Sequence, residues 1–153
     1  MNYTSVYLAG NMTCIAPEKF LSERRGVSKL LKVAGFKVLD PANKNRKSTT
    51  ASDYIRDSVS MTPKEIVEHD LRLIDASDIL LADLSRGPGY GMAMEVFYAF
   101  RRGKIVIGYI TNLAGDTFRQ ELSPWLIAHC HFITDTVKEA IEHAKWLDLE
   151  LGL

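Results

Sequence analysis

One acidic side chain, Glu95, falls on the apolar face of a predicted helix. It follows Met92 by three residues and precedes Ala99 by four, so helical spacing places all three on the same face. A carboxylate in that position is costly unless something uses it or satisfies it. We therefore predict a catalytic carboxylate. The alternative that Glu95 reaches solvent or pairs with Arg86 or Arg101 stays open.

A second acid, Asp70, has a similar setting on another predicted helix. It follows Ile66 by four residues and precedes Leu73 by three, whereas His69 beside it is expected to point elsewhere. Two inward carboxylates can supply a nucleophile and a proton donor to one site. From its position alone, Asp70 could also cap a neighbouring loop or pair with a buried arginine.

A glycine-rich loop connects a buried strand to the helix of Glu95. The apolar run at residues 79–82 predicts the strand, and the helix is expected from near Gly91 to just before Gly103. Between them, Gly87, Gly89 and Gly91 give the backbone conformational freedom and let a ligand approach the main chain. Ligands of parallel α/β sheets bind at the carboxyl ends of the strands, where such loops lie.

The remaining segments must position these residues, and they alternate between strands and helices. Further strands are predicted at residues 4–9, 36–39, 104–110 and 131–134, and further helices at residues 17–34, 63–76, 122–129 and 136–149. On the helix of Asp70, we expect Ile66, Val67, Leu73 and Ile74 to face inward. Residues 43–60 predict a long loop, with a short helical turn at 54–59. This order favours a parallel sheet covered by helices on both faces.

Composition favours a single domain over residues 1–153 that binds a small molecule. The chain is 46% hydrophobic and 25% charged, and its 19 basic residues balance its 19 acidic ones. That balance gives no overall field for nucleic acid or a membrane surface. Cys14 and Cys130 are too few for a disulfide framework, and no apolar run is long enough for a membrane span. We expect a cytoplasmic protein with reduced thiols.

Neither a cofactor nor a metal is predicted. The glycines at 87, 89 and 91 lack the GxGxxG spacing of dinucleotide-binding loops, and the phosphate-binding GxxxxGK[ST] motif is absent. His129 and His131 have no partner acid at ligand spacing, so the histidines do not indicate a metal site.

Five short motifs, in this order along the chain, resemble those of the nucleoside 2-deoxyribosyltransferase superfamily. They are Tyr7-Leu-Ala-Gly10, Asp40-Pro41, Glu68-His-Asp70-Leu, Ala76-Ser-Asp78 and Gly91-Met-Ala-Met-Glu95-Val-Phe-Tyr-Ala99. The resemblance implies a flavodoxin-like or Rossmann-like three-layer sandwich with a five-stranded parallel sheet. It also implies a homodimer or larger homo-oligomer whose subunits complete each other's sites.

The resemblance assigns three catalytic roles. Glu95 matches the family's nucleophile, Tyr7 its active-site tyrosine, and Asp70 the helix acid near the base. Cleavage of an N-glycosidic bond develops oxocarbenium character, which a carboxylate can capture as a glycosyl ester. The predicted reaction is transfer of a 2-deoxyribosyl group from a nucleoside to another nucleobase.

A departure from the family pattern bears on the substrate. The transferases carry an Asp that holds the sugar 5′-hydroxyl at the position of Gly89, and related N-glycosidases bind a 5′-phosphate there with small hydroxyl residues and amides. The first alternative is therefore hydrolysis of a nucleoside 5′-monophosphate, and the second is a non-catalytic nucleotide-binding domain. The predicted substrate-binding residues are Gly10, Asn11, Asp40, Ser85, Arg86, Gly87, Gly89, Gly91, Met92 and Ser123.

The segment around Ser123 is expected to lie at a subunit interface. Leu122, Trp125, Leu126 and Ile127 form a larger apolar cluster than a short surface helix needs. In the family, the corresponding segment reaches the neighbouring subunit's site, which would place Ser123 beside the 5′ end of the substrate.

Overall fold

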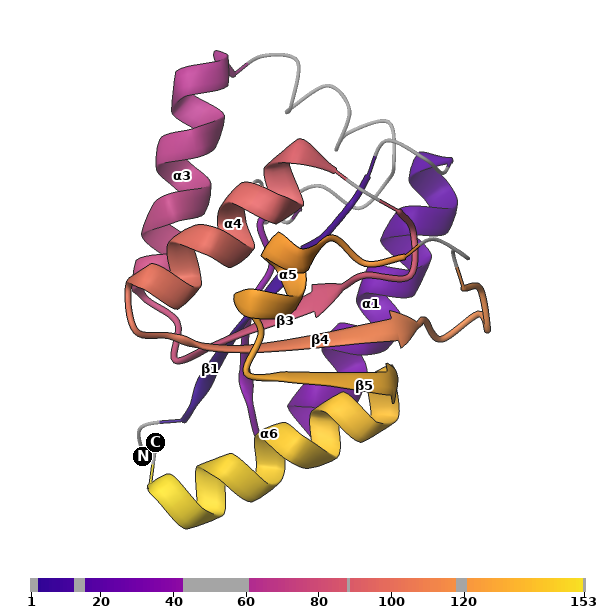
Figure 1. Cartoon of the computed structure of the whole chain (residues 1–153), viewed down its shortest axis with the longest axis vertical. Coiled ribbons are helices and arrows are strands. Elements are labelled where there is room, and N and C mark those ends of the chain that lie inside the picture. Colours follow the sequence, from indigo (N-terminus) through magenta and orange to yellow (C-terminus); the bar gives the residue numbers. More distant parts are fainter. Residues whose placement is uncertain (1–2, 13–15, 43–60, 88, 118–120, 153) are drawn as a thin grey trace.

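The computed structural model describes residues 3–12, 16–42, 61–87, 89–117 and 121–152. The predicted loop at residues 43–60, with its helical turn, lies outside the described residues. Strands and helices alternate along the chain (Figure 1) in the order β1 (Ser5–Gly10), α1 (Pro17–Val33), β2 (Lys37–Leu39), α3 (Pro63–Asp75), β3 (Ile79–Asp83), α4 (Tyr90–Arg101), β4 (Ile105–Thr111), α5 (Pro124–Ala128), β5 (Phe132–Thr136) and α6 (Val137–Leu151).

The strands form one parallel sheet in the order β2-β1-β3-β4-β5, which confirms the predicted five-stranded parallel sheet. The inner strand β1 pairs with β2 on one side and with the central strand β3 on the other. Tyr7 lies opposite Leu39 and Leu80, and Gly10 lies opposite Asp83. The carboxyl ends of β1 and β3 are therefore adjacent, where a ligand site is expected.

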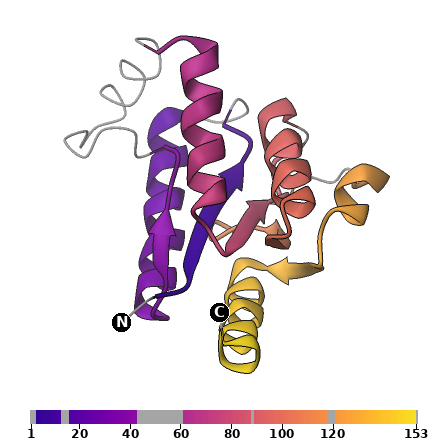
Figure 2. The same cartoon turned by 90° about the vertical axis from the view of Figure 1, so that its left-hand side faces the viewer.

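Helices lie on both faces of the sheet (Figures 1 and 2), so the three-layer architecture is also confirmed. A hydrophobic core lies between the helices and the sheet on each face. On one face, Leu31 of α1 and Ala144 of α6 pack against Leu8 and Leu81. On the other, α3, α4 and α5 contribute Ile74, Met92, Val96, Ala99 and Leu126, which pack with Tyr7, Ala9, Leu80 and Ala82. Because successive side chains of a strand alternate between faces, Tyr7 points toward α3 and α4 and Leu8 toward α1.

Side-chain caps fix where several helices begin. The Thr62 hydroxyl accepts from the Glu65 amide at 3.2 Å before α3, and the Thr136 hydroxyl accepts from the Glu139 amide at 3.2 Å before α6. Thr136 is thus the last residue of β5 and the cap of α6, so β5 runs two residues beyond its predicted end. Ser123 likewise caps α5, which is shorter than predicted.

The prediction that Val67 faces inward is wrong, because 53% of this residue is exposed. Of the four apolar residues predicted to face inward on α3, only Ile74 is fully buried, since the helix presents a narrow stripe to the core near its carboxyl end. Val67 is rotated by about 100° from Ile66, which takes it off that stripe. None of the described helices combines the length and apolar character needed to cross a lipid bilayer.

Candidate active site

Tyr7 lies at the centre of the candidate site and is fully buried. Within the described residues, its hydroxyl has no hydrogen-bond partner of regular geometry. The Glu95 carboxylate is nevertheless near enough to act on it as an acceptor. Burial is the largest cause that raises the pKa of Tyr7 far above its ordinary value of 10.0, followed by the negative charges of Glu95 and Asp70. Two carboxylates from different helices therefore lie near one buried hydroxyl.

Glu95 is held in the first two turns of α4, next to the glycine-rich loop. Met92 and Val96 anchor this part of the helix in the core, and Glu95 itself is partly buried. Its Oε1 atom is 4.0 Å from the position that a Cβ atom on Gly91 would occupy. The carboxylate thus lies toward the amino end of its own helix.

Asp70 is brought to the same place by α3, and it has an unexpected partner. Its side chain is only 16% exposed, and its Oδ1 atom lies 2.9 Å from Nδ1 of His69. The expectation that His69 points elsewhere is therefore wrong. Adjacent helical residues point about 100° apart, but Nδ1 lies near the base of the imidazole ring and can still reach a short neighbouring side chain.

Beside these acids in the sequence prediction, Asn11, Gly89 and the start of α4 lie together where the loops after β1 and β3 meet. Asn11 is buried, and a Cβ atom on Gly89 would lie 2.9 Å from Cγ of Asn11. Gly89 is the N-cap residue of α4 and has no side chain to cap it, and the first turn of the helix contains no acidic residue. The amides at this helix start can therefore serve an anion.

Ser85 and Arg86, predicted to bind a phosphate, interact with acidic groups of the protein. The Ser85 hydroxyl and amide both donate to Asp83, the amide at 2.9 Å. Arg86 is 8% exposed, donates to Glu23 and lies 3.5 Å from Asp116. Gly87 follows at a φ of 77°, which favours glycine. These contacts fix the loop, and a phosphate-binding role for the two residues stays a prediction.

Arg24 is a buried charged residue that the sequence interpretation missed. It lies on the buried stripe of α1 with Phe20, Val27 and Leu31, and it donates to the Leu8 carbonyl at 2.7 Å. It also lies 3.4 Å from Asp40, whose Oδ1 atom accepts from the Ala42 amide at 3.0 Å. The signal was available, because a cation on an apolar helical stripe is the same kind of exception as Glu95.

Ser123 lies away from Glu95 within one subunit. It precedes α5, which packs beside Ala93 and Phe97 of α4, whereas helical spacing places Glu95 on the side of α4 that faces α3. The structure of one chain therefore does not bring Ser123 to the other predicted site residues, and its role stays a prediction that depends on a second copy.

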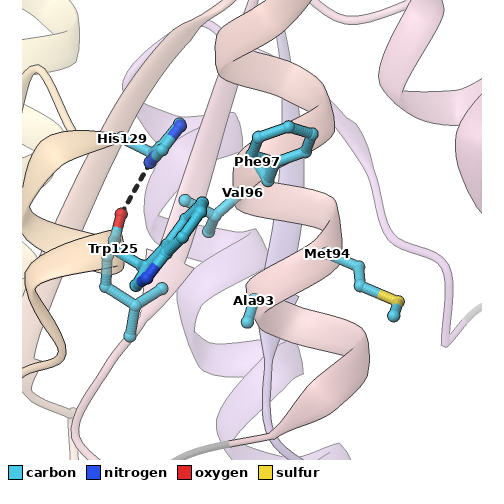
Figure 3. A pocket seen from close by; sticks show the side chains of 7 residues that line it. Ala93, Met94, Val96, Phe97, Trp125 and His129 are labelled. Atoms are coloured by element: carbon cyan, nitrogen blue, oxygen red, sulfur yellow. Dashed lines mark hydrogen bonds between the residues drawn. The ribbon is translucent and has the colours of Figure 1, made fainter.

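An apolar pocket lies between α4 and α5 (Figure 3). Its volume is about 360 Å³, and it is lined by Ala93, Met94, Val96, Phe97, Trp125, Leu126 and His129. The ring of Trp125 stacks on that of His129 with an interplanar angle of 4°, and His129 Nδ1 donates to the Trp125 carbonyl at 2.7 Å. Trp125 is 72% exposed and Met94 70% exposed. An exposed apolar surface of this kind is typical of a protein contact.

Comparison with known proteins identifies the family of this chain. Residues 6–124 match the family model described as Nucleoside 2-deoxyribosyltransferase. A protein of Thermofilum pendens, provisionally named a 2′-deoxynucleoside 5′-phosphate N-hydrolase, is 35% identical over 80 residues, which cover 49% of this chain and 55% of the relative. The matched region thus spans about half the length of that curated relative.

Solved structures share the fold over nearly the whole chain. A conserved protein from Enterococcus faecalis has a TM-score of 0.71 at 19% identity, covering 95% of this chain and 99% of that one. A 2-desoxiribosyltransferase from Leishmania mexicana has a TM-score of 0.66 at 18% identity, covering 94% and 97%. A CMP N-glycosidase from Clostridium botulinum has a TM-score of 0.56 at 17% identity, covering 95% and 99%.

Proposed function

Because the chain belongs to the nucleoside 2-deoxyribosyltransferase family, we propose that it cleaves the N-glycosidic bond of a 2′-deoxynucleoside 5′-monophosphate. The products are the free base and the sugar 5-phosphate. One observation carries this proposal: the carboxylates of Glu95 and Asp70, from two different helices, lie near the buried hydroxyl of Tyr7 on β1. That arrangement supplies a nucleophile, an acid and a neutral hydrogen-bond donor to one sugar.

Glu95 acts as the nucleophile in this mechanism. Its carboxylate attacks the anomeric carbon as the bond to the base nitrogen breaks, and the bonding electron pair leaves with the base. Asp70 gives a proton to that nitrogen, so the base departs neutral. Water then attacks the glycosyl ester, the C–O bond to Glu95 breaks, and the carboxylate is restored. One proton of the water returns to Asp70, and its hydroxyl becomes that of the sugar.

Tyr7 holds the nucleophile in place. Because burial and two nearby carboxylates raise its pKa, the phenol stays protonated at neutral pH. A neutral hydroxyl can donate to Glu95 without adding charge to the site. This donation would favour the ionised carboxylate and orient it before attack.

The 5′ side of the site favours a phosphate over a free hydroxyl. Gly89 and Asn11 carry no charge, and the start of α4 has neither a side-chain cap on Gly89 nor an acid in its first turn. A carboxylate at residue 89 would repel a phosphate, whereas helix-start amides attract it. The provisional name of the Thermofilum pendens relative refers to the same substrate class.

Transfer of the deoxyribosyl group to a second base is the alternative reaction. It is favoured by the description of the matching family, which names this activity. Both reactions use the same Glu95 ester and differ in whether water or a base nitrogen attacks it. Competition between water and an added base therefore distinguishes them.

We further infer that the active species contains at least two copies of the chain. The exposed apolar surface between α4 and α5 would be covered by a second copy. Ser123 lies at the start of α5 beside this surface, from where it would reach the 5′ side of the neighbouring site.

The test compares each of the four deoxynucleoside monophosphates with its nucleoside, with base release followed by chromatography. Two charge-assisted contacts to a phosphate, at about 1.5–3 kcal/mol each, predict a preference for the monophosphate of on the order of a hundredfold or more in kcat/KM. A preference for the nucleoside, with efficient transfer to an added base, would favour the transferase instead. E95Q serves as the inactive control.

A further inference from the structure

A small polar cavity lies on the α1 side of the sheet, beside the carboxyl ends of β3 and β4. Its volume is about 20 Å³, and its lining includes Glu23 of α1, Tyr109 of β4 and Asn112, the residue after β4. A buried water molecule needs a volume of about 10–15 Å³ and about two to four polar partners. The cavity therefore has the size of a single water molecule.

Two polar atoms of residues that line this cavity are buried and have no hydrogen-bond partner among the described residues. One is Oε1 of Glu23, which can only accept a hydrogen bond when the carboxylate is ionised, and the other is Nδ2 of Asn112, which can only donate. Asn112 is 6% exposed, and the Glu23 side chain is 15% exposed. Because an unsatisfied buried polar group is costly, the pair indicates a ligand that serves both atoms.

Hydrogen bonds within the protein fix the orientation of both side chains. Oδ1 of Asn112 accepts from the Ala114 amide at 2.9 Å and from the Asp116 amide at 3.0 Å. A flipped carboxamide would set its NH2 group against these two donors, so the network assigns Nδ2 rather than Oδ1 to the cavity. In Glu23, Oε2 accepts from Nη2 of Arg86, and Oε1 is the second oxygen. Each side chain is thus bound through one of its two polar atoms.

The same contacts form an open ring of four residues. Glu23 accepts from Arg86, whose Nη2 atom also lies 3.5 Å from Oδ2 of Asp116. The Asp116 amide in turn donates to Asn112. Within the described part of the chain, the ring is open between Oε1 of Glu23 and Nδ2 of Asn112. A ligand at that point would join α1 to the loops that follow β3 and β4.

Close packing sets the distance between α1 and the loop after β4. A Cβ atom on Gly26 would lie 2.8 Å from Cδ1 of Leu113, so Leu113 fills the space beside the helix at this glycine. Nearer the start of the helix, Nζ of Lys19 lies 2.9 Å from Oδ2 of Asp116. The loop thus contacts α1 both before and after Glu23, and it cannot move closer to Glu23 without disturbing these contacts.

The two atoms require a ligand that both donates and accepts. A metal cation or an ammonium ion cannot accept from Nδ2 of Asn112, and a simple anion cannot donate to Oε1 of Glu23. We propose that one ordered water molecule binds in this cavity, donates a hydrogen bond to Glu23 and accepts one from Asn112. The water closes the ring and fixes the loop after β4 to α1. This inference does not depend on the proposed catalytic function.

A crystal structure of the wild-type protein tests the site directly. The density of one water molecule should lie about 2.7–3.2 Å from both Glu23 Oε1 and Asn112 Nδ2. An empty cavity, a water that reaches only one of the two atoms, or a direct hydrogen bond between the two side chains would overturn the proposal. This measurement needs no variant, so it decides even where a substitution prevents folding.

A double-mutant cycle measures whether the two residues are coupled. N112D sets two acceptors at the cavity, and E23Q sets two donors there, because the Gln oxygen keeps the bond to Arg86. E23Q/N112D exchanges donor and acceptor, so that one water can bridge them in the reverse direction. Each single variant should raise the equilibrium constant of unfolding in urea by about tenfold. The double variant should raise this constant by about tenfold less than the product of the two single effects.

E18Q is the matched control, since Glu18 is an exposed residue of the same helix, and its effect should add to that of N112D. Repulsion between two carboxylates in N112D also produces coupling, so a crystal structure of E23Q/N112D separates the two causes. A water that bridges the exchanged side chains supports the proposal. Coupling with an empty cavity would overturn it, and so would additive effects of E23Q and N112D.

Discussion

A Cβ atom on Gly89 would lie 2.9 Å from Cγ and 3.0 Å from Oδ1 of Asn11. The Asn11 carboxamide thus fills the space in which a side chain at residue 89 would lie. Contacts of that length are essentially never seen for real Cβ atoms, so any substitution at Gly89 must displace Asn11 or the loop. We therefore expect that the proposed 5′ specificity changes only when both residues are replaced together.

For this reason we expect G89D alone to lose activity on both monophosphate and nucleoside. In the double variant N11G/G89D, the new carboxylate has room and should repel a phosphate while accepting a hydrogen bond from a 5′-hydroxyl. The ratio of kcat/KM for the two substrates should move toward the nucleoside by about tenfold or more, since one lost or gained charged contact is worth about 1.5–3 kcal/mol. N11G is the control. An unchanged ratio of kcat/KM values in the double variant would show that this pair does not determine the preference for the 5′ group.

E95Q should lose on the order of a thousandfold or more in kcat, as removal of a covalent nucleophile does in other enzymes. The thermal midpoint should stay close to that of the wild type, because Glu95 is partly exposed and Gln has nearly the same shape. Mass spectrometry of acid-quenched enzyme should detect a glycosyl adduct on wild type and none on E95Q. An adduct on E95Q would contradict the assignment of the nucleophile.

D70N should lower cleavage of an ordinary purine monophosphate by about 10²–10⁴, the usual contribution of a general acid. A 7-methylpurine nucleotide already carries positive charge on its base and leaves without a proton, so D70N should cleave it nearly as fast as the wild type does. H69Q, which removes the 2.9 Å contact to Asp70, should have a smaller effect in the same direction. If D70N lost equal activity on the ordinary and the 7-methylated nucleotide, Asp70 would act in substrate binding rather than in proton transfer.

Stability should fall at alkaline pH through Tyr7 and Tyr109. Burial is the main cause that raises the pKa of both above 10.0, so the folded state keeps protons that the unfolded state releases. This difference in proton binding leaves the free energy of unfolding intact below pH 10.0. As the pH rises further, the free energy of unfolding falls by about 1.4 kcal/mol per pH unit for each tyrosine. Measured by urea unfolding, the free energy of unfolding of Y7F should fall less steeply than that of the wild type between about pH 10 and about pH 11. Y90F, at a residue 92% exposed, should behave as the wild type.

W125S should dissociate the proposed oligomer and lower activity. An exposed aromatic side chain at the centre of a contact contributes about 2 kcal/mol or more, or about thirtyfold in dissociation constant. Light scattering should show a lighter species for W125S at concentrations where the wild type is assembled. W146S is the matched control, since Trp146 is 54% exposed on α6 and lies outside the α4–α5 pocket. A monomeric, fully active wild type would contradict the inference.

Much of the fold could be predicted from the sequence, because periodicity records which face of each element is buried. The stripe of Met92, Val96 and Ala99 and the apolar run of β3 predicted which side chains are buried. The alternation of strands with helices predicted the parallel sheet with helices on both faces. Glu95 and Asp70 were found as exceptions to the same periodicity. Arg24 fits this rule too, yet arginine can keep its charge in water while its stem packs on apolar residues, so the signal is weaker.

Contacts between side chains were harder to predict than faces. The approach of Asn11 to Gly89 depends on how two loops lie after β1 and β3, and that position is set by pairing between strands far apart in sequence. The contact between His69 and Asp70 depends on rotamers, which helical spacing does not specify. Residue types and spacing therefore predicted which side chains lie near one another better than which of their atoms make contact.

The position of β1 between β2 and β3 has a kinetic consequence. Tyr7 and Glu95 come from opposite ends of the first two thirds of the chain and meet only after β1 has paired with β3 and α4 has packed on both. Closing so long a loop is slow compared with forming any one helix. During refolding, enzymatic activity should therefore return no earlier than tertiary packing around β1, well after most of the helical circular dichroism signal has recovered.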